Sequence, residues 1–177
     1  MSIDRRRIIL VETSNFDSLF LDRDGVINKK LEGRYVSRWE EFEFMPNALQ
    51  AVNILSKLFK RIFIVTNQQG IGKGIMSQND LLFLHQKMLN EIEKAGGKIN
   101  KIYFCPHLET DNCNCRKPKI GMIEKAIQDF SSINIKKSYL IGDSPSDIKA
   151  GERAGLHTIK VNNNFTLHSW IKQILAH

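Results

Sequence analysis

The sequence predicts a single α/β domain built on a doubly wound parallel sheet. Short apolar runs alternate along the chain with longer segments whose apolar residues recur at helical spacing, and this alternation is typical of parallel sheets. The chain has 177 residues, of which 42% are hydrophobic and 25% charged, as expected for one globular domain with a substantial core. Several apolar runs end in polar, reactive side chains, which is where such sheets bind ligands.

The first strand is predicted at the apolar run Leu19–Leu21, which leads directly into Asp22, Asp24 and Gly25. Parallel sheets bind their ligands at the carboxyl ends of the strands, an edge that we call the mouth of the sheet. The two carboxylates are therefore candidates for ligand-binding or catalytic residues at this mouth. A simple turn is the alternative interpretation, since Asp and Gly are ordinary turn residues.

The segment 28–44 is polar, contains Gly33 and carries scattered aromatic side chains. We expect it to pass over the mouth of the sheet as a flap.

Pro46 and Asn47 then open a helix whose apolar stripe ends at Leu58.

The remaining elements follow from the same patterns. Four further apolar runs predict strands at 61–65, 101–104, 139–141 and 158–161. A helix capped by Ser77, with Asp80 three residues on, stops at Gly96. Further helices are predicted around the stripe from Ile123 to Phe130, from Ser146 to Ala154, and at 167–175.

Net charge and the lengths of the apolar runs indicate the kind of partner and the cellular compartment. The net charge of +7 favours acidic partners, either phosphorylated small molecules or nucleic acid. No apolar run approaches the roughly 20 residues that span a bilayer, and the run at 8–11 is too short for a secretory signal. We therefore expect a cytoplasmic protein without a membrane partner. Residues 1–17 are an N-terminal extension with a potential extra strand at 7–11.

Side chains suited to phosphoryl transfer follow several of the predicted strands. Asp22 and Asp24 close the first strand, Thr66 the second and Asp143 the fourth, while Lys117 lies between the third and fourth. One carboxylate can attack phosphorus and a second acid can protonate the leaving alkoxide. Carboxylates also suit Mg²⁺, and Lys117 and Thr66 can take up charge on the phosphoryl oxygens.

All three cysteines lie in one loop, at 105–115, together with a histidine. Three thiols and one imidazole form a set that suits a closed, tetrahedral Zn²⁺ site. The alternative, three unrelated thiols and a loop histidine, is disfavoured by their clustering. A saturated site has no open position for water, so the zinc would be structural. Its ligands would be Cys105, His107, Cys113 and Cys115.

Four motifs in the chain resemble those of the haloacid dehalogenase (HAD) superfamily of phosphatases. They occur in order on the expected elements, at 20–28, 65–68, 115–118 and 141–143. The resemblance covers most of the chain and implies a HAD-like, Rossmann-like domain without a cap, with 1–177 as one domain.

The resemblance also implies a role for each motif residue. Asp22 would be the nucleophile and a Mg²⁺ ligand, and Asp24 the general acid/base whose backbone carbonyl also binds the metal. Asp143 would be the third protein ligand of Mg²⁺. Thr66 and Lys117 would stabilise the phosphoryl group.

The zinc loop running into Cys-Arg-Lys-Pro narrows the resemblance to one subgroup. This subgroup contains D-glycero-D-manno-heptose 1,7-bisphosphate phosphatase and histidinol-phosphate phosphatase, and residues 26–28, 35–36 and 42–44 are more similar to the heptose enzyme. It implies a Mg²⁺-dependent phosphatase acting on a phosphorylated sugar through an aspartyl phosphate. We expect the protein to be a monomer. A histidinol-phosphate phosphatase and a polynucleotide 3′-phosphatase are alternatives, as is a non-catalytic zinc module for nucleic acid, although the zinc loop and the intact acidic motifs argue against nucleic acid.

The same resemblance implies the residues that bind substrate, with Arg116 recognising the distal phosphate. The full set is Arg23, Asn67, Gln68, Gln69, Arg116 and Ser144. Three departures from the pattern concern the substrate: Ser144 stands where a basic residue is usual, Arg34 replaces a glycine, and the first 17 residues are longer than expected. Asp147 is either a supporting acid of the last motif or an exposed residue in the first turn of a helix.

Overall fold

Five parallel strands form one sheet in the order β3-β2-β1-β4-β5. The structure is a computed structural model, and it describes residues 16–176. The strands are β1 (Ser18–Leu21), β2 (Arg61–Asn67), β3 (Lys101–Cys105), β4 (Tyr139–Gly142) and β5 (His157–Lys160). The chain moves outward from β1 in both directions, so β1 lies at the switch point where open α/β sheets bind their ligands. The predicted fold class is confirmed.

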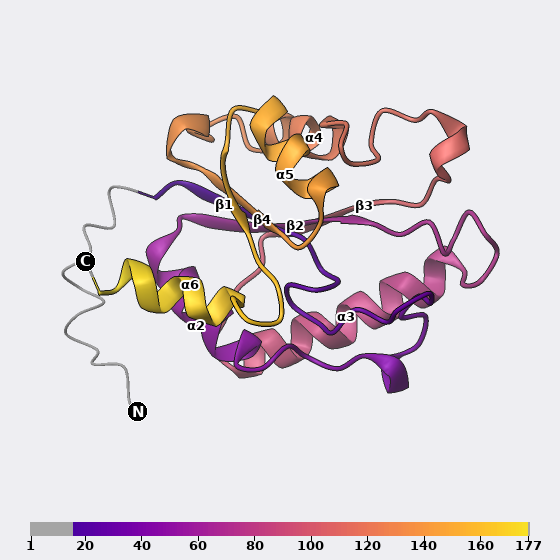
Figure 1. The fold of residues 1–177 in the computed structure, drawn as a ribbon, viewed down its shortest axis with the longest axis horizontal. Helices are drawn as coiled ribbons and strands as arrows, with labels where there is room; N and C mark the ends of the chain where they lie inside the picture. The colour runs from indigo at the N-terminus through magenta and orange to yellow at the C-terminus, as the bar shows by residue number, and fades with distance from the viewer. Residues whose placement is uncertain (1–15, 177) are drawn as a thin grey trace.

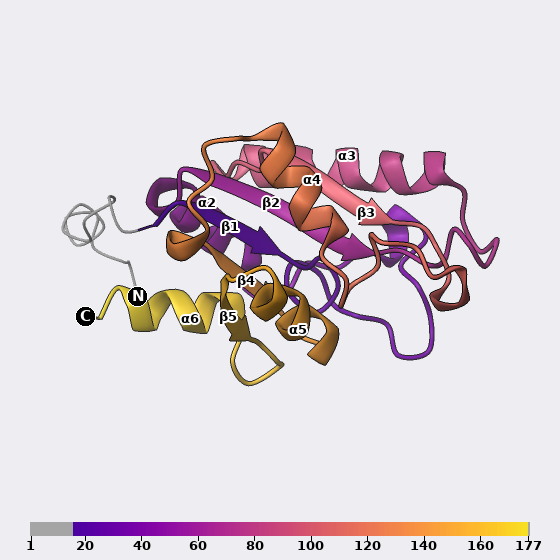
Figure 2. The ribbon, with the colours of Figure 1, turned by 90° about the horizontal axis from the view of Figure 1, so that it is seen from above.

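Helices cover both faces of this sheet (Figures 1 and 2). One face carries α2 (Ala48–Leu58), α3 (Gln78–Lys94) and α6 (Leu167–Ile174), and the other carries α4 (Gly121–Asp129) and α5 (Pro145–Arg153). In the described part of the chain, short 3₁₀ turns lie in the connections at η2 (Trp39–Glu41), η3 (Glu109–Asp111) and η4 (Ile135–Lys137).

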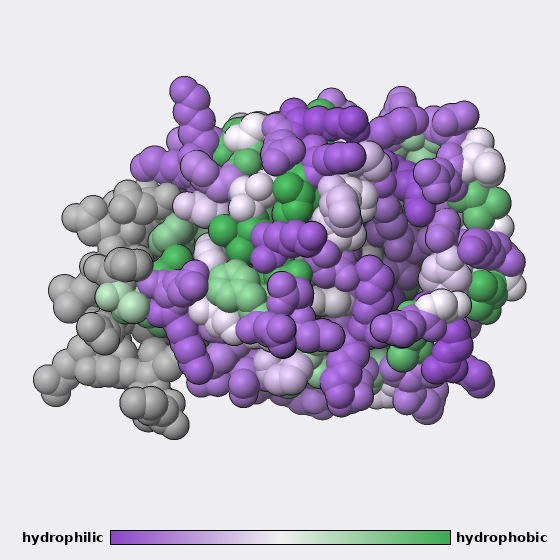
Figure 3. Space-filling model, viewed as in Figure 1, coloured by the Kyte–Doolittle hydropathy of each residue, from purple (hydrophilic) through white to green (hydrophobic). Residues whose placement is uncertain are grey.

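The core consists of two apolar layers, one on each face of the sheet. Successive strand residues point to opposite faces, so Leu19 and Leu21 join one layer and Phe20 joins the other. All three side chains are fully buried. Hydrophilic residues cover most of the face drawn in Figure 3, and hydrophobic residues appear there only as small patches.

The predicted elements lie close to the observed ones, with one instructive difference. Strand β2 continues through Thr66 and Asn67, which pair with Phe104 and Cys105 of β3. The two polar residues are therefore held by the sheet itself rather than by a loop. The extra strand predicted at 7–11 falls outside the described residues.

The segment 28–44 contacts α3 at Trp39, whose ring centroid lies 5.9 Å from the Lys87 ammonium, and it returns to its own start (Figure 1). Asn28 and Phe44 form an antiparallel bridge, and Lys29 donates a backbone hydrogen bond to Glu43 (2.7 Å). Trp39 stacks on Phe42 with ring centroids 5.0 Å apart. We call residues 28–44 the flap.

Candidate active site

The mouth of the sheet begins with Asp22, directly after β1. The Asp22 backbone N–H donates to the carbonyl of Ile141 on β4 (2.9 Å), which aligns the carboxylate with the end of the neighbouring strand. Gly25 has a φ of +86°, and a Cβ there would lie 2.5 Å from Asp143 Oδ2. Only glycine combines this backbone conformation with so close an approach, so Gly25 lets Asp143 sit beside the Asp22 loop.

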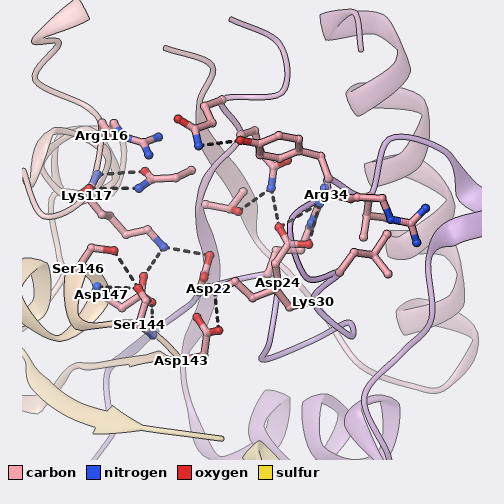
Figure 4. A pocket seen from close by; sticks show the side chains of 18 residues that line it. Asp22, Asp24, Lys30, Arg34, Arg116, Lys117, Asp143, Ser144, Ser146 and Asp147 are labelled. Carbon is pink, nitrogen blue, oxygen red and sulfur yellow. Dashed lines mark hydrogen bonds and ion pairs between the residues drawn. The ribbon is translucent and has the colours of Figure 1, made fainter. Parts of the chain in front are cut away.

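Lys117 is the centre of a buried ionic network (Figure 4). Its ammonium lies 2.9 Å from Asp22 Oδ1 and 2.5 Å from Asp147 Oδ1, and it donates to the carbonyl of Val65 (2.7 Å). The Asn67 side chain accepts from the Lys117 backbone N–H (3.0 Å) and donates to its carbonyl (3.1 Å). Lys117 is therefore held at both its backbone and its charged end.

The electrostatics of this network are set by burial and by opposite charges. Burial lowers the pKa of Lys117, but Asp22 and Asp147 outweigh it, so the pKa lies above its usual value and the ammonium stays charged. Burial raises the pKa of Asp22 to about 7, reinforced by Asp147 and Asp24 and opposed by Lys117.

Asp147 is fully buried, so the interpretation as an exposed first-turn residue is wrong. Its Oδ2 accepts hydrogen bonds from the Ser144 backbone (3.0 Å) and hydroxyl (2.5 Å), while Oδ1 faces Lys117. A Cβ on Gly142 would lie 2.2 Å from the Asp147 Cβ, so the glycine at the end of β4 makes room for this carboxylate. Ser144 serves as the N-cap of α5.

A divalent cation fits beside Asp22. Carboxylate oxygens of Asp22, Asp143 and Asp147 lie within 4.8 Å of one another, and Asp143 Oδ1 is buried with no hydrogen-bond partner. Oxygen donors of this kind suit Mg²⁺. The other oxygen of Asp143 contacts the ammonium of Lys30 on the flap (2.8 Å), so a cation already balances this acidic group.

Asp24 lies on the other side of Asp22 and is held by three side chains. Arg23 Nη2 lies 3.0 Å from both carboxylate oxygens, and Asn28 and Gln68 each donate to one of them (2.9 Å). Burial raises the pKa of Asp24, but the Arg23 charge and these hydrogen bonds outweigh it and hold the pKa below its usual value. Asp24 is therefore an anion in this state.

The acidic residues line a cavity of about 240 Å³. It brings together every predicted catalytic, substrate-binding and magnesium residue: Asp22, Arg23, Asp24, Thr66, Asn67, Gln68, Gln69, Arg116, Lys117, Asp143 and Ser144. The roles of these residues stay predictions.

Individual side chains differ in what they offer this cavity. The Thr66 hydroxyl accepts from Gln68 (2.8 Å), and Gln69 donates to the Tyr35 hydroxyl (2.7 Å). Arg116 Nη1 is buried without a partner, which leaves it available to an anion. The Arg23 guanidinium, by contrast, is almost fully buried (1% exposed) against Asp24.

Sequence reasoning missed the contribution of the flap. Lys30, Arg34 and Tyr35 line the cavity. Arg34 and Tyr35 were noted only in the family resemblance, and neither they nor Lys30 were predicted to line the site. The signal available was its basic and aromatic composition. His85 contacts Arg23 from α3 (3.2 Å), and nothing in its local sequence reveals this contact.

The cysteine loop gathers its four side chains at one point. Cys105, Cys113 and Cys115 have Sγ atoms 3.0–3.5 Å apart, and His107 Nδ1 lies 3.2 Å from Cys115 Sγ and 3.7 Å from Cys105 Sγ. Sulfur ligands at about 2.3 Å from a tetrahedral zinc ion are themselves about 3.8 Å apart, so the three Sγ atoms lie slightly closer together than they would around a bound ion. The donor set and its convergence on one point fit one Zn²⁺. Cys115 leads directly into Arg116 and Lys117.

Comparison with known proteins gives consistent matches. Residues 114–176 match the model of the HAD-hydrolase-like family. A D-glycero-alpha-D-manno-heptose-1,7-bisphosphate 7-phosphatase of Campylobacter jejuni is 43% identical over 146 residues, which is 82% of each chain. A D-glycero-beta-D-manno-heptose-1,7-bisphosphate 7-phosphatase of Helicobacter pylori is 37% identical over 88% of this chain and 90% of the relative.

A solved structure matches the fold as well. The D,D-heptose 1,7-bisphosphate phosphatase from B. bronchiseptica, complexed with magnesium and phosphate, superposes with a TM-score of 0.78 and 30% identity over 86% of both chains. Within residues 16–176, no helix has the length and apolar character needed to cross a membrane.

Proposed function

Because the chain belongs to the HAD-like family of D-glycero-D-manno-heptose-1,7-bisphosphate 7-phosphatases, we propose that it hydrolyses a heptose 1,7-bisphosphate through an aspartyl phosphate on Asp22. The observation that carries the proposal is the meeting of Asp22, Lys117 and Asp143 at the switch point of the sheet. The relatives include enzymes named for the alpha and for the beta anomer, and the proposal covers both.

In the first step an Asp22 oxygen attacks phosphorus and the bond from phosphorus to the sugar oxygen breaks. Lys117, fixed by Asn67 and Val65, places its charge beside the nucleophile and the incoming phosphoryl oxygens. The Thr66 hydroxyl lines the same cavity and can donate to one of these oxygens. Such preorganised charges and donors stabilise the transition state because they need no rearrangement.

Asp22 and Asp143 would hold Mg²⁺, in keeping with the magnesium in the related B. bronchiseptica structure. When bound, the ion supplies positive charge that offsets the repulsion between an anionic nucleophile and an anionic phosphate. Asp143 Oδ1, which is buried without a partner, is the oxygen most in need of such a cation.

Asp24 would act as the general acid and base. An anionic phosphoryl group bound next to it favours its protonated form, so it can give that proton to the leaving sugar alkoxide. Once anionic again, Asp24 accepts a proton from the water that attacks the aspartyl phosphate. This second step breaks the bond between Asp22 and phosphorus, releases phosphate, restores the Asp22 carboxylate and leaves Asp24 protonated.

The cysteine cluster would hold structural Zn²⁺. The loop that it closes contributes only Cys105 to the buried core, so four metal bonds would supply stability that packing does not. The same bonds would fix the position of Arg116 and Lys117, which follow the last ligand.

We expect purified protein to contain about one zinc per chain, since four ligands complete one site. Cys113→Ser should lose the metal and lower the melting temperature, whereas Asn114→Ser, at the exposed position between two ligands, should keep both. Metal analysis and thermal unfolding measure this. A zinc-free protein that is fully active and equally stable would contradict the structural role.

The second phosphate of the substrate would bind to Arg116. A guanidinium is a planar fork that suits phosphate, and the unpartnered Nη1 of Arg116 lines the cavity. Binding energy from this remote group helps to place the reacting phosphate, so it contributes to catalytic efficiency as well as to affinity.

Arg116→Ala should lower kcat/KM for the heptose bisphosphate by about 10- to 100-fold, because hydrogen bonds to charged groups contribute about 1.5–3 kcal/mol. The heptose monophosphate should change by less than about threefold. Steady-state kinetics at saturating Mg²⁺ measure both, with Arg38→Ala on the flap as the matched control. An equal loss on both substrates would contradict the assignment of Arg116.

A phosphate-release screen tests the proposed substrate itself. Wild-type protein should prefer heptose 1,7-bisphosphate over histidinol phosphate and over an oligonucleotide with a 3′-phosphate. A preference for either of the last two would overturn the substrate. A cytoplasmic location stays a prediction, supported by three cysteines that form no disulfide, as is usual in reducing compartments. A monomeric state also stays a prediction.

A further inference from the structure

A buried chain of polar contacts links helix α3 to Asp24. Arg23 Nη2 contacts both oxygens of Asp24 (3.0 Å each), and Arg23 Nη1 lies 3.2 Å from His85 Nε2. Arg23 is 1% exposed and His85 4% exposed. His85 lies within α3, 62 residues further along the chain.

The donors and acceptors in this contact determine the protonation state and the tautomer of the His85 imidazole. A guanidinium has only donors, so Nε2 of His85 must accept and the ring must be neutral, with its proton on Nδ1. Burial, together with the neighbouring Arg23 charge, lowers the pKa of His85 to about 3. The histidine therefore offers a fixed acceptor that does not change with pH near neutrality.

Without an acceptor at this position, a buried N–H of Arg23 would have no partner, which is costly. The guanidinium would turn to find one and would no longer face both Asp24 oxygens. Packing alone does not explain a histidine here, since an apolar residue would fill the space beside Phe104, whose ring centroid is 6.2 Å from the imidazole.

We propose that His85 is a positioning residue for the acid/base group: it holds Arg23 so that Arg23 orients the Asp24 carboxylate toward the leaving oxygen of the substrate. The inference rests on the proposed function, because it assigns Asp24 the proton transfer. His85 touches neither substrate nor metal and acts only through Arg23.

Two substitutions separate positioning from packing. His85→Leu keeps a side chain of moderate size but removes the acceptor. His85→Gln keeps an acceptor, because its amide oxygen can take the hydrogen bond from Arg23. The matched control is His168→Leu, a buried histidine on α6 that does not line the cavity.

The experiment compares two leaving groups under single-turnover conditions with saturating Mg²⁺. A sugar alkoxide needs a proton to depart, whereas the nitrophenolate released from p-nitrophenyl phosphate does not. His85→Leu should slow release of the sugar from the heptose bisphosphate at least about 10-fold, a part of the 10²–10⁴ typical of acid–base catalysis. The concentration of bisphosphate that gives half the maximal single-turnover rate, and the first turnover of p-nitrophenyl phosphate, should each stay within about twofold.

His85→Gln should recover most of the rate on the bisphosphate, and His168→Leu should match the wild type. In an Asp24→Asn background, His85→Leu should add no further loss, since a positioning residue has nothing left to position. Equal slowing of both substrates by His85→Leu, failure of Gln to rescue, or additivity with Asp24→Asn would overturn the proposal.

The failure of the proposed substrate is a separate result. Wild-type protein that cleaves p-nitrophenyl phosphate but not the heptose bisphosphate would overturn the substrate and leave the phosphatase chemistry standing. The same variants would then be compared on histidinol phosphate, whose leaving group also needs a proton, and the same outcomes would decide the role of His85.

Discussion

Asp22→Asn should lower kcat by on the order of 10⁴-fold or more, comparable to the loss of a nucleophile in other covalent enzymes. An amide of the same shape cannot attack phosphorus as an anion, and it provides a poorer oxygen for Mg²⁺. Phosphate release from the heptose bisphosphate measures the loss. Intact mass of acid-quenched protein should detect covalent phosphate on the wild type and none on the variant.

Folding should be retained in this variant. Burial raises the pKa of Asp22 to about 7, which means that its charged form is costly to bury, and a neutral amide does not carry that cost. We expect a melting temperature that is equal to or above the wild-type value. Asp129→Asn, on α4 and outside the cavity, is the matched control and should stay active. Near-wild-type turnover by Asp22→Asn would contradict the covalent mechanism.

Lys117→Met should abolish activity and also destabilise the fold. Methionine keeps the length of the side chain but leaves Asp147, which is fully buried, without a positive partner. Removing one member of a buried pair costs about 3–5 kcal/mol, which corresponds to a fall of about 10 °C in melting temperature for a chain of this size. Thermal unfolding and kinetics on the same preparation measure the two effects.

A second substitution separates these effects. Lys117→Met combined with Asp147→Asn removes the uncompensated charge and should recover at least half of the lost stability, while activity stays absent. Full loss of stability in the double variant would show that Lys117 acts through packing of its stem rather than through its charge. Unchanged stability of the single variant would contradict the ionic network.

The zinc loop and the active centre are joined by adjacent residues rather than by a long pathway. Cys115, Arg116 and Lys117 are consecutive in the sequence. A metal ion bound to Cys115 would therefore fix the backbone position at which the segment with both phosphate-facing cations begins. Asn67 fixes the other end through two hydrogen bonds to the Lys117 backbone. The position of Lys117 is therefore determined from two sides.

Much of the fold and most of the cavity lining were predictable from the sequence. Strand and helix positions follow from apolar periodicity, and this signal is local because it reflects which side of each segment is buried. The placement of Asp22 and Asp143 at one edge follows because parallel strands all end on the same side of the sheet. The cysteine cluster could be predicted because its four side chains lie within eleven residues of one another in the sequence.

Only the tertiary structure decided which partner each polar group takes. Asp147 is buried against Lys117 rather than exposed, and Arg23 turns away from solvent to join His85 and Asp24. These choices connect residues up to 62 positions apart, and their cost or benefit depends on what surrounds them once water is excluded. A sequence pattern indicates which side of a segment is buried. Which charged side chains pair depends on how separate elements pack around β1.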